Sequence, residues 1–435
     1  MKKKVIYLLS VLCAVYMGGC SSSQDDNILE EAAGTVAESV EDKENTSDKP
    51  ENPTENETTT ESEPEPEPIR VDIIMVGDIL LHDRVNESGL MEDGSYNYDH
   101  MFAQVKEDIS AADIAIVNQE VILGGRDMGL SGYPAFNGAF EVGHSLVDAG
   151  FDVVLHATNH ALDKRKKGLL TCLSFWEENY PQIGVLGIHD TEEDAAEIYV
   201  TEVEGIKIAI LNYTYGTNGI ALPDDMPYAV DMWDEDAIRA DVELAKAMAD
   251  FIVVCPHWGT EYVFEETKDQ QKKAQFLADL GVDLIIGTHP HVVEPVKWIK
   301  GENGNDTLVY YSIGNFINAT SGDHTGAAAR MLGAMAKITL TTDGEDVWIE
   351  SYGVEPLVTH LVEGSGKITT YRLEDYTKEL EALNEMEKQD SSFSIEYCEQ
   401  ICIDVFGDLY YNDVTCAPNT SEDESIDYSE IELVD

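Results

Sequence analysis

The chain has 435 residues, enough for two domains of ordinary size or for one large domain with tails. Its formal net charge is −58 at pH 7. A surface this acidic repels phosphate backbones and favours cations, so the composition argues against nucleic-acid binding and fits a metal site.

The first 20 residues have the order of a secretory signal peptide. Three lysines precede an apolar stretch that is too short to span a membrane comfortably. The ending Gly-Gly-Cys20 is similar to a bacterial lipoprotein lipobox, although Met17 stands where leucine is usual. We expect residues 1–20 to be a lipoprotein signal, with Cys20 lipidated and the protein anchored at the extracellular face of the cell membrane. A plain signal peptide with an incidental cysteine is the alternative.

Residues 21–68 carry sixteen acidic residues against two lysines and contain no aromatic residue. Such a segment cannot bury enough apolar surface to fold, and charge repulsion and proline keep it extended. It is predicted to be a disordered acidic stalk between the anchor and the folded body, and an acidic binding tail is the alternative. Residues 418–435 are predicted to be a second acidic, frayed tail.

From residue 69, strand-like and helix-like patterns alternate, which is typical of βαβ units and of a layered α/β domain. The main domain is expected over 69–360, followed by a helical extension over 361–417. Strands are predicted at 71–78, 113–117, 151–155, 183–188, 251–255 and 282–286, with a hairpin over 198–211. Helices are predicted at 102–112, 141–149, 169–179, 234–249, 267–280 and 373–388. Residues 307–312, 333–341 and 347–354 are predicted to be strands of a second sheet.

The cysteines give little functional signal. Cys172 and Cys255 lie in apolar surroundings and are expected to be core residues. Cys398 and Cys402 are candidates for a disulfide, but their spacing alone does not establish one.

Several predicted strands end in side chains that can bind a metal. Open α/β sheets place their ligands at the carboxyl ends of strands, so these residues are expected to meet there. A glycine, Gly77, is expected to let the chain turn after the first strand. The candidates are Asp78, His82, Glu120, Asn159, His160, His257, His289 and His291. Their mixture of carboxylate, amide and imidazole suits manganese, iron or zinc, and a bridging carboxylate would allow two ions about 3.5–4 Å apart.

The candidates differ in strength. His289 and His291 flank a proline that fixes their relative direction, and packing alone gives little reason for them. Asn159 would also serve as a helix cap, which is compatible with metal binding. His82 is explained equally well by a hydrogen-bonding role. His156 is expected to be a core histidine.

Six motifs occur in order over roughly residues 70–320: Val-Gly-Asp78, Asn118-Gln-Glu120, Ala-Thr-Asn159-His160-Ala-Leu-Asp163, Pro-His257-Trp-Gly-Thr-Glu261-Tyr, Gly-Thr-His289-Pro-His291-Val and Tyr-Ser312-Ile-Gly-Asn315-Phe. Together they resemble the CapA family of poly-γ-glutamate capsule-biosynthesis proteins, within the calcineurin-like metallophosphoesterase superfamily. The resemblance implies a four-layer α/β/β/α metallophosphoesterase-like sandwich with a centre of two divalent metal ions between its sheets.

The resemblance also implies roles for individual residues. One metal would be held by Asp78 and His291, and the other by Asn159, His257 and His289. Glu120 would bridge the two ions and His160 would donate a proton, with His82, Glu261 and Asn315 in possible supporting positions.

Two departures from the superfamily pattern bear on these roles. Leu80 stands where the superfamily usually has the histidine of an Asp-x-His motif. The bridging position is a glutamate, Glu120, instead of the usual aspartate. Occupancy of the first metal position and a full phosphoesterase mechanism are therefore open.

Three functions follow as hypotheses. The first is a lipid-anchored CapA-like protein in the synthesis, export or anchoring of an anionic γ-glutamyl polymer, with membrane synthase subunits as partners. The second is a general cell-surface metal-dependent phosphoesterase, a hydrolase acting on a phosphoester substrate. The third is a noncatalytic scaffold of a membrane polymer synthase. The acidic chain argues mildly against tight binding of a polyanion unless metal ions bridge the two.

Overall fold

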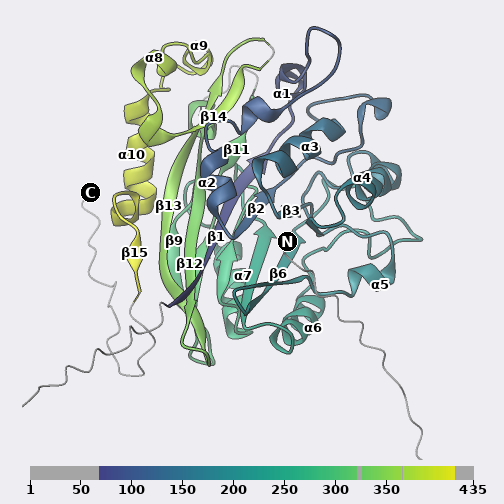
Figure 1. Ribbon diagram of the computed structural model, residues 1–435, viewed down its shortest axis with the longest axis vertical. Coiled ribbons are helices and arrows are strands. Elements are labelled where there is room, and N and C mark those ends of the chain that lie inside the picture. Colours follow the sequence, from purple (N-terminus) through teal and green to yellow (C-terminus); the bar gives the residue numbers. More distant parts are fainter. Residues whose placement is uncertain (1–67, 321–325, 365, 417–435) are drawn as a thin grey trace, which may run out of the picture. The chain divides into compact units, whose positions relative to one another are not determined.

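Two β-sheets packed face to face form the centre of the folded body in the computed structural model (Figure 1). The structure describes residues 68–320, 326–364 and 366–416. The predicted signal peptide, Cys20, nearly all of the stalk and the acidic tail lie outside these residues. Among the described residues, no helix is long and apolar enough to cross a membrane.

The first sheet has the strand order β14-β13-β12-β1-β2-β3-β4, with β11 also paired to β1 and β15 to β13. β1 through β4 run parallel, whereas β12, β13 and β14 are antiparallel to their neighbours. The strands are β1 (Ile69–Ile79), β2 (Ile114–Asn118), β3 (Val153–Leu155), β4 (Gly184–Leu186), β11 (Asn315–Ile317), β12 (Leu332–Thr342), β13 (Val347–Leu361), β14 (Ile368–Arg372) and β15 (Val414–Thr415).

The second sheet has the order β5-β6-β7-β8-β10-β9, with β6, β7, β8 and β10 parallel. The strands are β5 (Val200–Val203), β6 (Ile206–Thr214), β7 (Phe251–His257), β8 (Leu284–Ile286), β9 (Val296–Lys300) and β10 (Asp306–Tyr310). The predicted hairpin is confirmed as β5–β6. Its turn residues Glu204 and Gly205 have φ of 51° and 88°, which match the twist of the two strands.

Helices cover the outer faces of both sheets, which gives the α/β/β/α order of layers (Figure 1). They are α1 (Asp83–Ser88), α2 (Lys106–Ala111), α3 (Phe140–Ala149), α4 (Arg165–Asn179), α5 (Glu192–Ala195), α6 (Glu235–Lys246), α7 (Lys268–Asp279), α8 (Lys378–Glu381), α9 (Met386–Gln389) and α10 (Ile395–Phe406). The predicted four-layer fold class is confirmed.

The alternation of side chains along β7 shows how one strand serves two cores. Phe251, Val253 and Cys255 face the first sheet and join the central core. Ile252 and Val254 point the other way and pack with the apolar faces of α6 and α7. Both faces of the strand are therefore buried, as expected of a parallel strand inside a layered α/β fold.

Residues 333–341 and 347–354 do form strands, but the prediction that they belong to the second sheet was wrong. They lie in β12 and β13, and β12 pairs antiparallel with β1 from Ile69 opposite Thr342 to Val76 opposite Met335. The chain crosses back to the first sheet through β11, where Asn315 pairs with Asp78. The prediction failed because closeness in sequence to β10 does not determine which sheet a strand joins.

The predicted turn at Gly77 was also wrong, because β1 continues through this residue to Ile79. A Cβ atom on Gly77 would lie 1.8 Å from the carbonyl oxygen of Gly314 in the returning chain. Glycine is required here by the close approach of two backbones.

The single helix predicted over 373–388 is broken into α8 and α9. Asn384 between them is buried, its side-chain amide donates to the carbonyl of Thr359, and its side-chain oxygen accepts from the backbone N–H of Met386. This polar side chain anchors the segment to β13, so a continuous helix is not formed. The helix predicted from residue 102 begins only at Lys106. Cys398 and Cys402 are free thiols on α10, so the disulfide candidate is not formed.

Candidate metal centre

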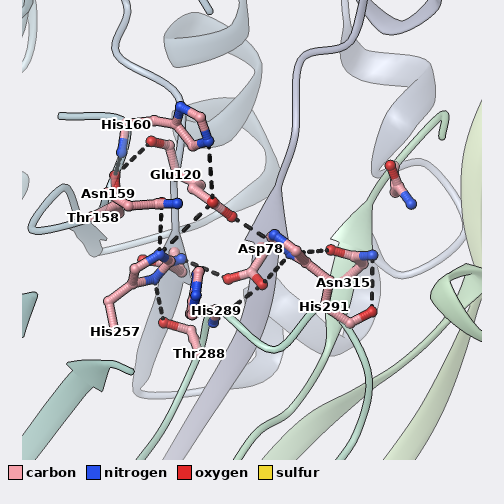
Figure 2. A network of polar contacts seen from close by, with 12 residues as sticks. Asp78, Glu120, Thr158, Asn159, His160, His257, Thr288, His289, His291 and Asn315 are labelled. Carbon is pink, nitrogen blue, oxygen red and sulfur yellow. Dashed lines mark hydrogen bonds and ion pairs between the residues drawn. The ribbon is translucent and has the colours of Figure 1, made fainter. Parts of the chain in front are cut away.

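Seven buried polar side chains gather where the carboxyl ends of parallel strands from both sheets meet (Figure 2). Four of them lie at or after the ends of β1, β2 and β3 in the first sheet, and three lie at or after the ends of β7 and β8 in the second. These residues are Asp78, Glu120, Asn159, His160, His257, His289 and His291. The structure therefore brings together the residues that the motif spacing singled out, over a span of 213 residues between Asp78 and His291.

Asp78 is held from both sheets. The side-chain amide of Asn118 donates to its Oδ1 at 2.7 Å, and Nδ1 of His291 lies 3.0 Å from its Oδ2. The same Nδ1 lies 3.1 Å from Oδ1 of Asn315. Burial alone would lower the pKa of His291, but the carboxylates of Glu120 and Asp78 raise it to about 9. An imidazolium at this position therefore offsets part of the negative charge when no metal ion does so.

Glu120 lies between two sets of imidazoles. Its Oε1 is 3.7 Å from Nε2 of His257 and 3.9 Å from Nε2 of His160, and its Oε2 is 3.8 Å from Nδ1 of His291. The residue has no exposed surface, and neither carboxylate oxygen has a hydrogen-bond partner among the described residues. Burial therefore raises the pKa of Glu120 well above its ordinary value, opposed in part by His291. A cation between these groups would remove the cost of burying that carboxylate.

His257 is oriented by its neighbours. Oγ1 of Thr288 lies 3.0 Å from its Nδ1, which leaves Nε2 at 3.0 Å from Oδ1 of Asn159. Burial, followed by the positive charge of neighbouring imidazoles, lowers the pKa of His257 and of His289 well below the ordinary value. Both rings are thus neutral, the form in which histidine binds a metal. Nδ1 of His289 is buried and has no partner among the described residues.

The loop after β8 adopts an uncommon backbone to present its two histidines. φ is 98° at His289 and 60° at His291, on either side of Pro290. Residues with side chains rarely take such values, and the strain persists only where surrounding structure enforces it. The Trp258 backbone N–H donates to the carbonyl of Thr288 at 3.0 Å, and the Tyr262 backbone N–H to that of Pro290 at 2.8 Å. The strain therefore lies at the predicted ligands, where function accounts for it.

Two triads of ligand atoms fit a metal ion, and they share one residue. Asp78, Glu120 and His291 form the first, and Glu120, His257 and His289 form the second; the ligand atoms within each triad lie within 4.8 Å of one another. The orphaned oxygens of Glu120 and the orphaned Nδ1 of His289 lie in this cluster. A donor set of carboxylate and imidazole matches divalent transition metals, so the residues present fit divalent metal binding.

His160 lies at the edge of the cluster and faces Glu120 through its Nε2. Its Nδ1 is 2.7 Å from Oδ2 of Asp163, which also accepts the backbone N–H of Phe136 at 2.7 Å. Because the Asp163 carboxylate accepts a hydrogen bond from Nδ1–H, the other ring nitrogen, Nε2, is free and is directed at the cluster. This carboxylate–imidazole pair can exchange a proton with a molecule bound beside Glu120.

The three possible supporting residues have different surroundings. Asn315 lies against His291 and donates to its carbonyl at 3.1 Å. Glu261 is exposed, yet it forms a third possible ligand group with His289 and His291. The His82 side chain makes no hydrogen bond within the described residues; it packs edge-on against Phe136, and burial, then the charge of His291, lowers its pKa to about 4. The hydrogen-bonding role suggested for His82 is therefore not seen among the described residues.

Sequence reasoning gave no role to several residues that hold the cluster together. They are Asn118, Asp163 and Thr288, which bond Asp78, His160 and His257 respectively. Each stands inside a quoted motif, two or three residues from a ligand or beside one, so the motif signal was present without an assignment. His156 is a core histidine as predicted: it is buried, and its Nε2 accepts from the Trp176 indole N–H at 3.2 Å.

Comparison with known proteins places these residues in one family. The sequence model described as bacterial capsule synthesis protein PGA_cap matches residues 72–320. PGA biosynthesis protein CapA of Bacillus subtilis (strain 168) is 34% identical over 175 residues, which is 40% of this chain and 44% of that protein. Capsule biosynthesis protein CapA of Bacillus anthracis is 27% identical over 263 residues, 57% of this chain and 60% of that protein. The chain thus spans about half the length of the curated relatives it matches.

Solved structures also resemble this chain. One is a 5'-nucleotidase precursor from Thermus thermophilus, and the matched region covers 67% of this chain and 54% of the nucleotidase chain, with 15% identity and a TM-score of 0.43. The calcineurin-like phosphoesterase YfkN from Bacillus subtilis covers 77% of this chain and 99% of its own, with 12% identity and a TM-score of 0.38.

Proposed function

The chain belongs to the bacterial capsule synthesis protein PGA_cap family, and from this membership together with the geometry of the cluster we propose that it is a metal-dependent hydrolase of capsule polymer biosynthesis. We propose further that the polymer is an anionic γ-glutamyl chain. A single observation carries the chemical part: the two unpartnered, fully buried oxygens of Glu120 each face a separate group of metal-competent side chains.

Two divalent ions would share Glu120 as a ligand. Asp78 and His291 would complete one position, and His257, His289 and the Asn159 side-chain oxygen would complete the other. Such ions, when bound, supply an electrophile for a substrate oxyanion and lower the pKa of water at the site. Manganese, iron and zinc all suit this donor set.

The chain's own residues supply the remaining steps. Asp163 accepts the Nδ1–H of His160 and sets the direction of the ring, so that the imidazolium form can deliver its Nε2 proton to the leaving group of a bound substrate and return to the neutral ring. Thr288 and Asn315 keep the ligand rings of His257 and His291 in place. Burial of the whole cluster in low-dielectric surroundings strengthens each of these electrostatic contacts.

At the level of the cell, we propose a protein anchored through Cys20 at the extracellular face of the membrane, working with membrane synthase subunits. The motifs of the N-terminal segment and the family of the body support this setting. The strongly acidic composition favours a role for the metal ions in bridging protein and polymer, since otherwise the two polyanions repel each other.

The first experiment is metal analysis of the purified full chain by mass spectrometry, beside the His257→Ala/His289→Ala variant. The matched control, His100→Ala/His144→Ala, removes two histidines outside the cluster. Two ions per chain in the parent and the control, with loss in the cluster variant, would support the proposal. A parent that binds no transition metal would overturn it and leave a noncatalytic scaffold as the better description.

A chain that binds metal is then assayed for the bond it cleaves. The panel contains a phosphomonoester, a phosphodiester and a γ-glutamyl oligomer. Cleavage of the oligomer supports the capsule-polymer function, and cleavage of the phosphoesters alone supports a general surface phosphoesterase. The His160–Asp163 pair is the observation that favours a catalyst of either kind over a scaffold, because a purely structural metal site has no use for a proton donor at its edge.

A further inference from the structure

A buried cation that has no anionic partner among the described residues lies beside the proposed metal centre. Arg330 lies in the short 3-10 helix Ala328–Met331 before β12 and is only 9% exposed, and its buried Nε has no hydrogen-bond partner among the described residues. Among residues 68–320, 326–364 and 366–416, no carboxylate forms an ion pair with it. Burying an unpaired charge is costly, and this chain has 85 acidic residues against 27 basic ones. That no acidic side chain among the described residues pairs with Arg330 therefore suggests that it faces an anionic ligand.

Tyr262 holds the guanidinium from one side. The Arg330 guanidinium carbon lies 3.8 Å from the centroid of the Tyr262 ring, so the two groups form a cation–π pair. A guanidinium stacked on a ring keeps its N–H donors at its edges, where they can meet a planar or tetrahedral oxyanion through two bonds. The loop bearing Tyr262 is fixed by the bond from its backbone N–H to the Pro290 carbonyl, and φ of Tyr262 is 67°.

Two independent connections place this cation next to a metal ligand. The ring of Tyr262 lies 6.0 Å from the ring of His291, between centroids. On the other side, the side-chain amide of Asn315 donates to the Arg330 carbonyl at 2.9 Å, while its oxygen lies 3.1 Å from Nδ1 of His291. Arg330 is thus connected to the surroundings of His291 through its side chain and through its backbone.

We propose that Arg330 and Tyr262 form an oxyanion-binding subsite that takes a second anionic group of the substrate, next to the bond cleaved at the metal centre. This inference rests on the proposed function and deepens it, because it requires a substrate with an acidic group near the scissile bond. Two sources fit the chemistry. In a γ-linked glutamyl chain every residue keeps a free α-carboxylate, and a phosphoester carries its own phosphate oxygens.

The test measures anion binding to the manganese-loaded full chain by calorimetry, with inorganic phosphate and γ-glutamylglutamate as separate probes. We expect Arg330→Gln to weaken binding of at least one probe about tenfold to a hundredfold, the range for a lost charge-assisted hydrogen bond. Arg330→Lys keeps the positive charge but loses the two parallel N–H donors of the guanidinium, so it should bind the probes more tightly than Arg330→Gln and less tightly than the parent. Tyr262→Phe keeps the ring and should change binding less than Tyr262→Leu.

The matched control is Arg126→Gln. Arg126 is likewise stacked on a tyrosine, Tyr96, at 5.2 Å, but it has an acidic partner, Glu141, at 3.0 Å. Its removal should leave the affinity for both probes unchanged. Metal content and the thermal unfolding midpoint are measured for every variant, so that a loss of fold or of metal is recognised, and Arg330→Lys remains a test if Arg330→Gln does not fold.

Each result decides the inference. Weaker binding of the dipeptide alone supports a carboxylate subsite, and weaker binding of phosphate alone supports a phosphate subsite. If all variants hold two ions and bind both probes as the parent does, the subsite is refuted while the metal centre stands. If the parent holds no ion, the proposed function itself fails, and this inference fails with it.

Discussion

Replacing Glu120 by glutamine should make the metal-free protein more stable while removing its response to metal. Glu120 is fully buried, and neither of its oxygens has a hydrogen-bond partner among the described residues. Glutamine has nearly the same shape but carries no charge, so the substitution removes a buried carboxylate whose charge His291 offsets only in part. At the same time it removes the ligand that the two triads share.

The two effects have opposite signs and similar sizes. An unsatisfied buried polar group costs about 1–3 kcal/mol, and more when it is charged, so metal-free Glu120→Gln should gain at least about 1 kcal/mol. A ligand that binds only the folded state stabilises it by about 2.7 kcal/mol at a concentration of 100 times its Kd. The parent should show that gain on adding manganese, and the variant should lose most of it.

The assay is urea unfolding with a chelator and with excess manganese. Glu294→Gln is the matched control, because Glu294 is also fully buried with one unpartnered oxygen but lies outside the triads. The control should change the unfolding midpoint yet keep the full response to manganese. A metal-free Glu120→Gln protein that is less stable than the parent, or one that manganese still stabilises fully, would refute this account of the site.

Three further outcomes are expected. Asp163→Asn should leave the metal content unchanged but lower turnover of the cleaved substrate about 10²-fold or more, because His160 loses the acceptor that fixes its tautomer. Equal turnover by the parent and the variant would exclude the proton-donor role of His160. Gly77→Ala should lower both metal content and the unfolding midpoint, because its Cβ would stand 1.8 Å from the Gly314 carbonyl oxygen; a normal midpoint would show that the strands can separate cheaply. Burial alone would lower the pKa of His189, but two aspartates raise it from 6.5 to about 9. His189 therefore stabilises the fold fully below pH 6.5 and loses this contribution as the pH rises through 9. His189→Gln should flatten the dependence of the unfolding free energy on pH in this window, and an unchanged dependence would contradict the assignment.

Much of the fold and of the cluster could be predicted because the residues of the cluster stand at or near the ends of strands that the local apolar pattern identifies. Several strands of the parallel parts are continuous apolar runs that end in, or are soon followed by, a polar residue of the cluster. For Asp78, Glu120 and His257 the position at a strand end was enough to place them at one edge of a sheet.

What could not be predicted depends on pairing between distant segments. No local signal says that β12 pairs with β1 in the first sheet, because an apolar strand pattern does not identify its partner strand. Arg330 was missed for the same reason: its place beside His291 follows from the return of the chain through β11. The break between α8 and α9 was missed because Asn384 is buried against β13, which its own sequence neighbourhood does not reveal.

The division of the ligands between two sheets has a consequence for the time course of folding. Asp78 and His291 are 213 residues apart, and β1 is paired on one side with β12, which follows both of them in the chain. The ligands therefore come together only when contacts of very high sequence separation form, and such contacts are slow to form because a long loop must close. We expect these contacts to form after the folding transition state, so that a bound ion would hold the two sheets together only afterwards. The ion should leave the folding rate unchanged and lower the unfolding rate, so metal binding should increase the kinetic stability of the protein without accelerating its folding.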